Sequence, residues 1–391
     1  MIDLARLRLA ICTDTYPPQV NGVARTLARL VEAVRQRGGK AQVFTVADPE
    51  AVEADDIVRF SSRPFWAYPQ LQVAFPGARA MTSALRTFEP TVVHVATEFG
   101  IGLAGRAAAR RMAVPLVTSY HTNFAAYAAH YQLGFLASPG WQYLRWFHNG
   151  AMRTFCPTEA IRSDLRQRGI RRSRVWSRGV DSDRFSPVHR SSELREKIGA
   201  SDDSVVISYI GRLAPEKGIP MALEAMRLTA LARPGRVRFL IGGDGPIEGA
   251  LRERAPSEAT FLGRLEGAAL SAAFASSDLF VFPSTTDTFG NVMLEAMASG
   301  VPVVGADVPP TREVLGTDGW LIEPGNAPAM ARQLIHLVDH PDELALMKRR
   351  ARERAMQQSW DQIWDRLGSE YLALQARPAH PQSILHTLPS T

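Results

Sequence analysis

The sequence lacks several features that define other classes of protein. It has two cysteines among 391 residues, Cys12 and Cys156, and neither belongs to a CxxC pair, so neither a disulfide framework nor a cysteine metal site is expected. No apolar run is long enough to span a bilayer. No signal peptide is visible, because Arg6 and Arg8 precede only a short strand-like segment. These absences lead us to expect a cytoplasmic protein with ordinary packed domains.

The net charge of +6 and the pI near 9.6 predict an affinity for anions, although nearly all the basic residues are arginine. Nucleotide phosphates and an acidic membrane surface are the candidate partners. Nucleic acid is not expected, because no basic segment forms a recognisable binding module. Residues 63–77 and the helical-looking stretch 124–155 are rich in aromatics and arginine. They fit either docking at a lipid interface or an ordinary packed helix pair.

Buried strands alternate with helices along the whole chain, which predicts an α/β fold with parallel sheets covered on both faces. The rhythm restarts after a polar stretch at 186–204, so we expect two doubly wound domains around a cleft at their strand ends. The expected units are residues 1–180, 181–359, a helix at 360–376 that crosses back to the first domain, and a disordered tail at 377–391. The expected strands are 7–14, 41–46, 91–97, 115–120, 205–211, 237–243, 260–263, 279–284 and 302–307, with helices at 23–37 and 100–112.

The stretch TTDTFGNVMLEAMASGVPVV, residues 285–304, places Glu295 in an otherwise apolar helical run. A buried carboxylate is costly unless something pairs with it. The helix is expected to begin near 290–291 and to end at Gly300, after a strand at 280–282. Its N-terminus suits a phosphate, with Asp287 before it and Glu295 after it to take hydroxyls. A nucleotide sugar has that layout, but a core acid paired with an arginine would fit Glu295 equally well.

Other polar residues follow strand ends that should face the same cleft. Arg212 and Lys217 in GRLAPEKG could hold a diphosphate, or they could be a solvated surface pair. Gly243 in GGDGP would let a ligand or another backbone approach closely. Gly22 in NGV could admit a phosphate, although this loop lacks the GxGxxG pattern and no GxxxxGK[ST] motif occurs.

Two further signals concern catalysis and metals. His121 ends the strand PLVTSY on the cleft side, where it is either catalytic or a structural residue with satisfied partners. The DSD sequence at 181–183 has the form of a DxD metal site, but it falls at the domain linker and not beside a nucleotide-binding strand end. We therefore expect no metal and no resident cofactor.

Taken together, the motifs resemble glycosyltransferase family 4, whose members are retaining enzymes of the GT-B fold. The resemblance covers roughly residues 7–375. The glycine loop of the family is matched at Gly22, its histidine at His121, its Arg/Lys pair at Arg212 and Lys217, and its E-x7-E signature by DTFGNVMLE. The segments HTNF, HYQLGFL and YLRWFHN are most similar to bacterial GDP-mannose-dependent mannosyltransferases and diacylglycerol glycosyltransferases.

The resemblance assigns roles to individual residues. It implies catalytic roles for His121, Asp287, Arg212 and Lys217. It implies donor binding by Gly22, Arg212, Lys217, Gly243, Leu265, Asp287, Phe289, Gly290, Asn291, Val292 and Glu295, and acceptor-side roles for Asn21, Tyr120 and Asn123. Base contacts are expected from the backbone around 262–266. One departure is that Asp287 stands where the family has glutamate, which weakens any assignment of the donor sugar.

The resemblance therefore implies a retaining transfer of a hexose from GDP-mannose or a UDP-hexose to a lipid such as diacylglycerol, at the inner face of the membrane. No convincing nucleophile is present, which agrees with a front-face mechanism in which a leaving phosphate oxygen takes the proton of the acceptor. Transfer to a soluble oligosaccharide or metabolite, a GT-B epimerase and a catalytically silent nucleotide-sugar-binding subunit are the alternatives.

Overall fold

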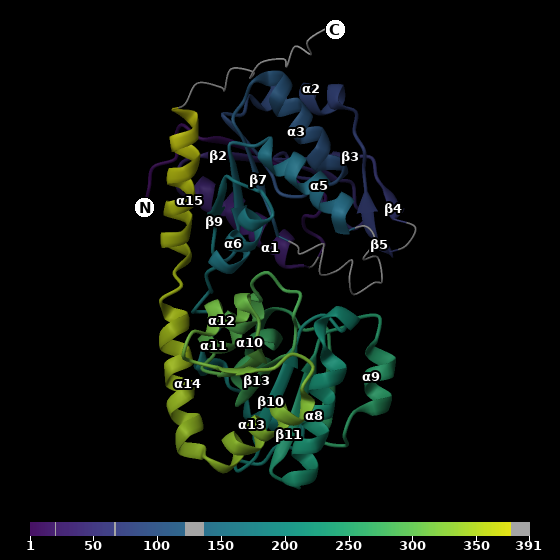
Figure 1. Ribbon diagram of the computed structural model, residues 1–391, viewed down its shortest axis with the longest axis vertical. Coiled ribbons are helices and arrows are strands. Elements are labelled where there is room, and N and C mark those ends of the chain that lie inside the picture. The colour runs from purple at the N-terminus through teal and green to yellow at the C-terminus, as the bar shows by residue number, and fades with distance from the viewer. Residues whose placement is uncertain (20, 66–67, 122–136, 377–391) are drawn as a thin grey trace, which may run out of the picture.

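The computed structural model describes residues 1–19, 21–65, 68–121 and 137–376, which form two α/β domains (Figure 1). The first domain is built on a seven-stranded sheet with the order β3-β2-β1-β6-β7-β8-β9, and every strand pair in it is parallel. Its strands are β1 Arg8–Cys12, β2 Lys40–Val46, β3 Ile57–Phe60, β6 Val92–Val95, β7 Leu116–Ser119, β8 Arg153–Cys156 and β9 Ser173–Val175.

Alternating side chains along the strands supply two apolar layers, as expected for a sheet buried on both faces. In β1, Leu9 and Ile11 pack on one side with α1 and α15, while Ala10 and Cys12 pack on the other with α2, α3 and α5. The helices of this domain are α1 Gly22–Gln36, α2 Ala78–Phe88, α3 Gly100–Met112, α5 Ala137–Asn149 and α6 Glu159–Gln167, joined by α15 Trp360–Gln375.

The second domain repeats the plan with a six-stranded sheet in the order β12-β11-β10-β13-β14-β15, again entirely parallel. Its strands are β10 Val205–Ile210, β11 Val237–Gly242, β12 Ala259–Gly263, β13 Leu279–Phe282, β14 Val303–Ala306 and β15 Trp320–Ile322. Its helices are α7 Ser192–Lys197, α8 Ile219–Ala232, α9 Glu248–Arg254, α10 Gly267–Ala275, α11 Asn291–Ala298, α12 Pro309–Leu315, α13 Ala327–Asp339 and α14 Pro341–Met356.

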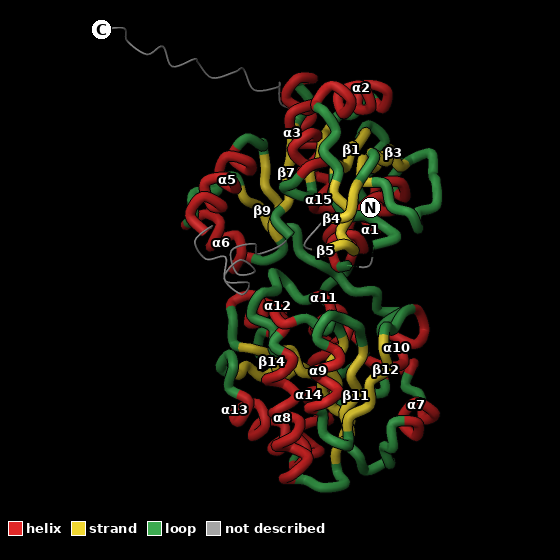
Figure 2. Tube along the Cα trace, turned by 90° about the vertical axis from the view of Figure 1, so that its right-hand side faces the viewer, coloured by secondary structure: helices red, strands yellow, loops and turns green. Residues whose placement is uncertain are grey.

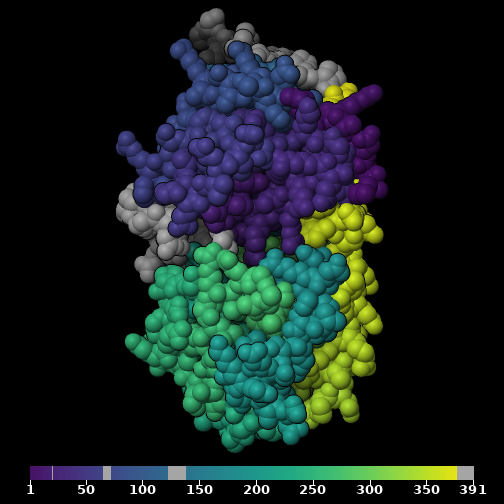
Figure 3. Space-filling model, turned by 180° about the vertical axis from the view of Figure 1, so that it is seen from behind, coloured from purple at the N-terminus to yellow at the C-terminus, as the bar shows by residue number. Residues whose placement is uncertain are grey.

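The last two helices join the domains along one side of the molecule (Figures 1 and 3). Helix α14 packs on the second domain through Ala351 and Ala355, whereas α15 packs in the core of the first through Trp364 and Tyr371. The Tyr371 hydroxyl lies 2.8 Å from His94 Nδ1 at the centre of that sheet. The C-terminal helix therefore belongs to the apolar core of the domain that the N-terminus begins.

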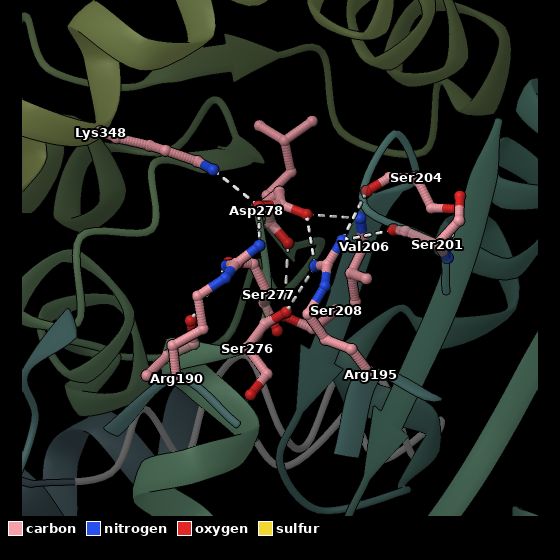
Figure 4. Close-up of polar contacts among 12 residues, drawn as sticks. Arg190, Arg195, Ser201, Ser204, Val206, Ser208, Ser276, Ser277, Asp278 and Lys348 are labelled. Carbon is pink, nitrogen blue, oxygen red and sulfur yellow. Dashed lines mark hydrogen bonds and ion pairs between the residues drawn. The ribbon is translucent and has the colours of Figure 1, made fainter. Parts of the chain in front are cut away.

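The polar segment between the domains is tied to the second sheet by a buried carboxylate, Asp278 (Figure 4). This side chain precedes β13 and contacts Arg190 at 3.1 Å, Arg195 at 2.9 Å and Lys348 at 2.6 Å. It also accepts a hydrogen bond from the Val206 N–H at 2.9 Å. The linker, α7 and α14 are thus held at the amino ends of the strands, away from the domain cleft.

The α/β fold of two doubly wound domains is confirmed. The structure adds strands that were not expected, namely the edge strands β3, β9 and β15, the internal strand β8, and an antiparallel hairpin of β4 Arg63–Phe65 and β5 Tyr68–Val73. The helical interpretation of 124–155 is wrong at its end, because residues 153–155 belong to β8. Residues 122–136 and the tail 377–391 lie outside the described part. Within the described residues, none of the helices has the length and apolar character that crossing a bilayer requires.

Candidate functional site

The loops that follow β10 and β13 lie side by side, because these two strands are neighbours in the sheet. Gly218 ends the first loop in a left-handed conformation (φ 69°), and a Cβ there would lie 2.8 Å from the carbonyl oxygen of Pro283. Only glycine allows this approach. As a result, Lys217 Nζ lies 2.7 and 2.9 Å from the two carboxylate oxygens of Asp287. The structure thus brings together two residues that the sequence predicted for one site.

Arg212 lies in the same loop and forms an ion pair with Glu216. The Glu216 side chain is fully buried, whereas that of Arg212 is 41% exposed. Burial raises the pKa of Glu216, but the hydrogen bond and charge of Arg212 outweigh it, so that the pKa lies below its usual value. Arg212 and Lys217 are therefore each held by an internal carboxylate, which argues against a simple solvated surface pair.

Helix α11 begins at the cleft without a side-chain cap from any described residue. Gly290 precedes it at φ 82°, and a Cβ at this position would clash with Phe282 and Met293 at 2.7 and 2.8 Å. The side chains of Phe289 and Val292 pack inward against the apolar core. At these positions it is the backbone around Gly290 and Asn291, with the positive end of the helix dipole, that can meet an anion.

Helix α1 of the first domain lies next to α11 of the second domain where the two domains meet (Figure 2). A Cβ built on Gly22 would lie 3.5 Å from Asn291 Nδ2, so two helix N-termini from different domains converge. The Asn21 side chain caps α1: its Oδ1 accepts from the Ala24 N–H at 2.9 Å, and its Nδ2 donates to Thr15 Oγ1 at 2.7 Å. In this arrangement Asn21 shapes the loop that carries Gly22.

Glu295 does have an arginine partner, but that partner comes from the other domain. Arg25 of α1 places Nη1 3.7 Å from Glu295 Oε1, and the Glu295 side chain is only 12% exposed. Burial raises the pKa of Glu295, while the charges of Arg25, Arg29 and Arg184 lower it less strongly. The alternative of a buried acid paired with an arginine is therefore confirmed, and the structure adds that the arginine belongs to the other domain.

His121 has one ring nitrogen with a partner and one without a partner among the described residues. Arg178 Nη2 donates to His121 Nδ1 at 3.0 Å, which assigns the ring proton to Nε2 because a guanidinium only donates. Burial, and then the charge of Arg178, lower the pKa of His121 well below its usual value. Nε2 is buried and has no hydrogen-bond partner among the described residues. The backbone oxygen of His121 accepts from Thr288 Oγ1 of the second domain at 2.7 Å.

Two residues close to His121 in the sequence, Tyr120 and Asn123, were predicted to lie on the acceptor side. The side chain of Tyr120 is buried in the first domain and stacks on Trp141 at 6.5 Å between ring centroids, so it cannot meet an acceptor in this arrangement. Asn123 lies outside the described residues.

The domains also touch at the start of α6. The carboxylate of Glu313 accepts the backbone N–H groups of Glu159 and Ala160 at 2.8 and 2.9 Å, and thereby caps α6 from the other domain.

Gly243 and Leu265 have structural reasons for their positions. A Cβ on Gly243 (φ 126°) would lie 1.9 Å from the Gly211 carbonyl oxygen, so the close approach at this glycine is that of another backbone. Leu265 packs against the core, and a Cβ on Gly242 would lie 2.6 Å from it. Both residues support the loops of the cleft, whichever ligand those loops bind.

One glycine pattern escaped the sequence interpretation. Residues 100–105, GIGLAG, match GxGxxG at the start of α3, where a dinucleotide-binding fold would hold a pyrophosphate. Here the position is filled by Asp14, whose Oδ1 accepts from the Ile101 N–H at 2.9 Å and whose Oδ2 accepts from Thr97 Oγ1 at 2.6 Å. The match therefore serves helix packing around an internal carboxylate.

The carboxylate of Asp181 in the linker is engaged locally, because its Oδ1 accepts from the Arg184 N–H at 3.0 Å. At Asp183 it is the backbone carbonyl oxygen that lies 2.8 Å from His189 Nε2. In the described part of the chain no three His, Cys, Asp or Glu side chains are grouped as a metal site would require.

Comparison with known sequences agrees with this geometry. Residues 20–184 match the profile of Glycosyltransferase Family 4, and residues 204–340 match that of Glycosyl transferases group 1. The chain is 36% identical over 355 residues to a GDP-mannose-dependent alpha-mannosyltransferase of Mycobacterium tuberculosis, which covers 88% of this chain and 92% of the relative. It is 29% identical over 312 residues to an alpha-monoglucosyldiacylglycerol synthase of Streptococcus pneumoniae, covering 76% and 70% of the two chains.

Solved structures share the architecture at lower identity. A sucrose-phosphate synthase from Thermosynechococcus elongatus superimposes with a TM-score of 0.75 at 19% identity, over 94% of this chain and 98% of that one. HepE of Anabaena, in complex with UDP and glucose, gives a TM-score of 0.72 at 21% identity, over 94% and 99%. The chain therefore belongs to glycosyltransferase family 4 and is a hexosyltransferase with the GT-B fold.

Proposed function

We propose that this enzyme transfers a hexose, with retention, from GDP-mannose or a UDP-hexose to a lipid acceptor of the diacylglycerol type at an anionic membrane. The observation that supports the choice of donor is the convergence of two helix N-termini where the domains meet. Two helix N-termini, marked by Gly22 and Asn291, meet. Lys217 is paired with Asp287 in the loop that leads into the second of these helices, and Arg212 lies in the same loop as Lys217. Backbone N–H groups and these cations are the usual ligands of a diphosphate.

The arrangement supports specific roles in the reaction. Arg212 and Lys217 would neutralise the charge that grows on the departing nucleoside diphosphate, which is commonly the largest electrostatic contribution to such a transfer. This also supports a reaction without an essential metal ion. His121 would donate from Nε2 to the reacting sugar, since its pKa is lowered and its Nδ1 is occupied by Arg178.

Asp287 is engaged by Lys217, which supports a front-face transfer in which the leaving phosphate oxygen accepts the proton of the attacking hydroxyl. Trapping of a covalent glycosyl-enzyme on Asp287 or another carboxylate would contradict this mechanism.

The distribution of charge supports an anionic membrane as the partner. Residues 57–158 contain nine arginines, two glutamates and neither lysine nor aspartate, so this segment carries more positive charge than the +6 of the whole chain. Helices α2, α3 and α5 of this segment contain no acidic residue. Exposed basic residues of such a segment attract acidic lipids by about 1 kcal/mol for each one that lies near the membrane.

Exposed aromatics accompany this charge. Phe75, Phe99 and Trp146 are 74%, 50% and 52% exposed. Phe75 lies at the start of α3, where a Cβ on Gly100 would be 3.1 Å from its ring. Arg106 of α3 is buried and stacks 3.9 Å above the ring of Trp146, so it supports this exposed ring from beneath. Aromatic rings and arginines together suit the interface between lipid headgroups and acyl chains.

Hydrolysis and thermal stabilisation with GDP-mannose, UDP-glucose, UDP-glucuronate and UDP-galactose, with and without vesicles of diacylglycerol and anionic lipid, test the proposal. We expect a response to one donor and turnover that requires the vesicles. Turnover on a soluble glycan without vesicles would show that the acceptor is soluble and is not a lipid. Donor binding without turnover on any acceptor would favour a silent nucleotide-sugar-binding subunit.

A matched pair of variants tests the membrane surface. Phe75→Ser should weaken sedimentation with anionic vesicles roughly several-fold, because it removes an exposed ring from the proposed contact. Leu231→Ser, at a residue of α8 that is 68% exposed, changes a similar apolar side chain on the other domain and should have no effect. Equal effects of the two changes would overturn the assignment of this surface.

A further inference from the structure

The cross-domain ion pair of Arg25 and Glu295 has an unusual geometry. Its 3.7 Å separation is within ion-pair range but longer than a charge-assisted hydrogen bond. Arg25 keeps 44% of its side chain exposed, whereas Glu295 keeps 12%. Among the described residues, this mostly buried carboxylate thus has its ion pair with a half-exposed cation from the other domain.

Space is available beside this pair. A cavity of about 30 Å³ is bounded by Arg25, Arg29, Asp181, Asn291, Glu295 and Trp360, among others. Arg29 lies one turn after Arg25 on α1, with its guanidinium 5.3 Å from the centre of the Trp360 ring. The charges of Arg29 and Arg184 also act on Glu295. Positive charge would therefore remain around Glu295 if Arg25 moved away.

The proposed diphosphate position lies within one helical turn of Arg25. Gly22, three residues earlier on α1, is where the two helix N-termini meet, with Asn291 opposite. A guanidinium that leaves Glu295 can therefore reach an anion at this point without any change in the backbone of α1. An arginine suits such an exchange because its planar fork matches both carboxylate and phosphate.

We propose that Arg25 is a positioning residue that exchanges partners: it pairs with Glu295 while the donor site is empty, and on donor binding the ribose hydroxyls take Glu295 while Arg25 moves to the diphosphate. The inference rests on the proposed function, because it takes a nucleoside-diphosphate sugar as the ligand. It adds a residue of the first domain whose movement couples donor binding to the approach of the two domains.

The exchange predicts opposite effects on two fragments of the donor. A nucleoside must displace Arg25 from Glu295 and offers no phosphate in return, so Arg25 opposes its binding. A nucleoside diphosphate provides Arg25 with a new partner, so Arg25 favours its binding. A residue that only maintains the fold would change both affinities in the same direction.

Calorimetric titration of wild type, Arg25→Met and Arg25→Lys with guanosine, GDP, uridine and UDP tests this. For the base that the wild type binds, Arg25→Met should lower the Kd of the nucleoside by about threefold and raise that of the nucleoside diphosphate by about tenfold. Arg25→Lys keeps a point charge, so each of its Kd values should lie between that of the wild type and that of Arg25→Met. Arg35→Met, which removes the pair of Arg35 with Asp56 at the far end of the same helix, should leave both Kd values unchanged.

Two results would overturn the inference in distinguishable ways. If the wild type binds nucleoside diphosphates and Arg25→Met shifts both fragments in the same direction, the exchange is wrong and the proposed function stands. If the wild type binds no nucleoside diphosphate at all, the exchange and the proposed function are both wrong.

Discussion

Two buried carboxylates in the second domain stand at opposite ends of one strand, and their surroundings differ. Asp278, before β13, is contacted by Lys348 at 2.6 Å and by Arg190 at 3.1 Å. Burial raises its pKa, but the neighbouring cations outweigh this and the pKa lies below its usual value. Glu295, in the helix after β13, has an ion pair of 3.7 Å with Arg25, and burial leaves its pKa raised.

We interpret this difference as one between a carboxylate that holds the structure together and one that, in the proposed function, binds a ligand. Asp278 has strong partners on both oxygens, so its charge contributes to stability at neutral pH. Glu295 remains ionisable in a setting that disfavours its charge, a cost that folding alone does not explain. Such perturbed groups in a cleft mark functional sites more often than structural ones.

The largest expected effect breaks the structural cluster. Asp278→Asn would leave Arg190, Arg195 and Lys348 without their counter-charge, and should lower the free energy of unfolding by about 3–5 kcal/mol. Urea unfolding followed by circular dichroism measures this. Asp339→Asn is the control, because Asp339 pairs with Arg233 and Arg236 near the surface, and should cost much less. Similar losses for the two variants would remove the structural role of the Asp278 cluster.

The second largest effect is expected on turnover, when the guanidinium of Arg212 at the cleft is replaced. Arg212→Ala would leave the buried Glu216 without its ion pair. A loss of activity in this variant could then come from lost stability as well as from lost catalysis. Arg212→Lys keeps a charge for Glu216 but loses the planar fork that can hold two phosphate oxygens. We expect kcat to fall about 10²-fold with a melting temperature close to that of the wild type. Wild-type turnover in Arg212→Lys would contradict the assigned role of the guanidinium.

Glu295→Gln should act in the opposite sense to Asp278→Asn. A neutral amide of the same shape removes a charge that burial disfavours, so we expect stability to be unchanged or slightly higher. Binding of the nucleoside diphosphate should weaken about tenfold, because a carboxylate accepts ribose hydroxyls more strongly than an amide does. The comparison between the two carboxylates fails if this variant loses as much stability as Asp278→Asn.

The same contrast predicts two opposite dependences of stability on pH. Because the folded pKa of Asp278 lies below the ordinary 3.8, its contribution is present above that pH and is lost as the pH falls through the folded value. Because the folded pKa of Glu295 lies above 4.5, stability should fall as the pH rises from 4.5 through the raised value. Unfolding of the wild type and the two variants from pH 3 to 7 checks both signs: Asp278→Asn should flatten the acidic limb, and Glu295→Gln the fall above pH 4.5.

The fold could be predicted from the sequence where strands are central and apolar. The strands β1, β10 and β13 were expected because their side chains are buried on both faces. The edge strands β9 and β15 have three residues each and are partly exposed, so they lack a continuous apolar run. Strand β8 was hidden by the aromatic residues before it, which favoured a longer helical segment.

The site could be predicted where a motif lies within one loop, and not where a partner comes from the other domain. Lys217 and Asp287 follow neighbouring strands, so parallel topology was enough to bring them together. Arg25 pairs with Glu295 only because two domains meet, which no local pattern encodes. A usable signal did exist, since Arg25 and Arg29 lie one turn apart on the helix that follows the glycine loop.

The smallest expected effect tests whether the Asp278 cluster keeps its contribution to stability when one of its cations is removed. Lys348 has a 31% exposed side chain, whereas Arg195 has 8% exposed and also bonds the carbonyl oxygens of Ser204 and Ser276. Lys348→Met should therefore cost about 0–1 kcal/mol in urea unfolding, because Asp278 keeps Arg195 and its backbone donor. Arg195→Met should cost several times more, because it leaves buried carbonyl groups without a donor. Equal losses would mean that the charge around Asp278, and not its hydrogen bonds, separates this carboxylate from Glu295.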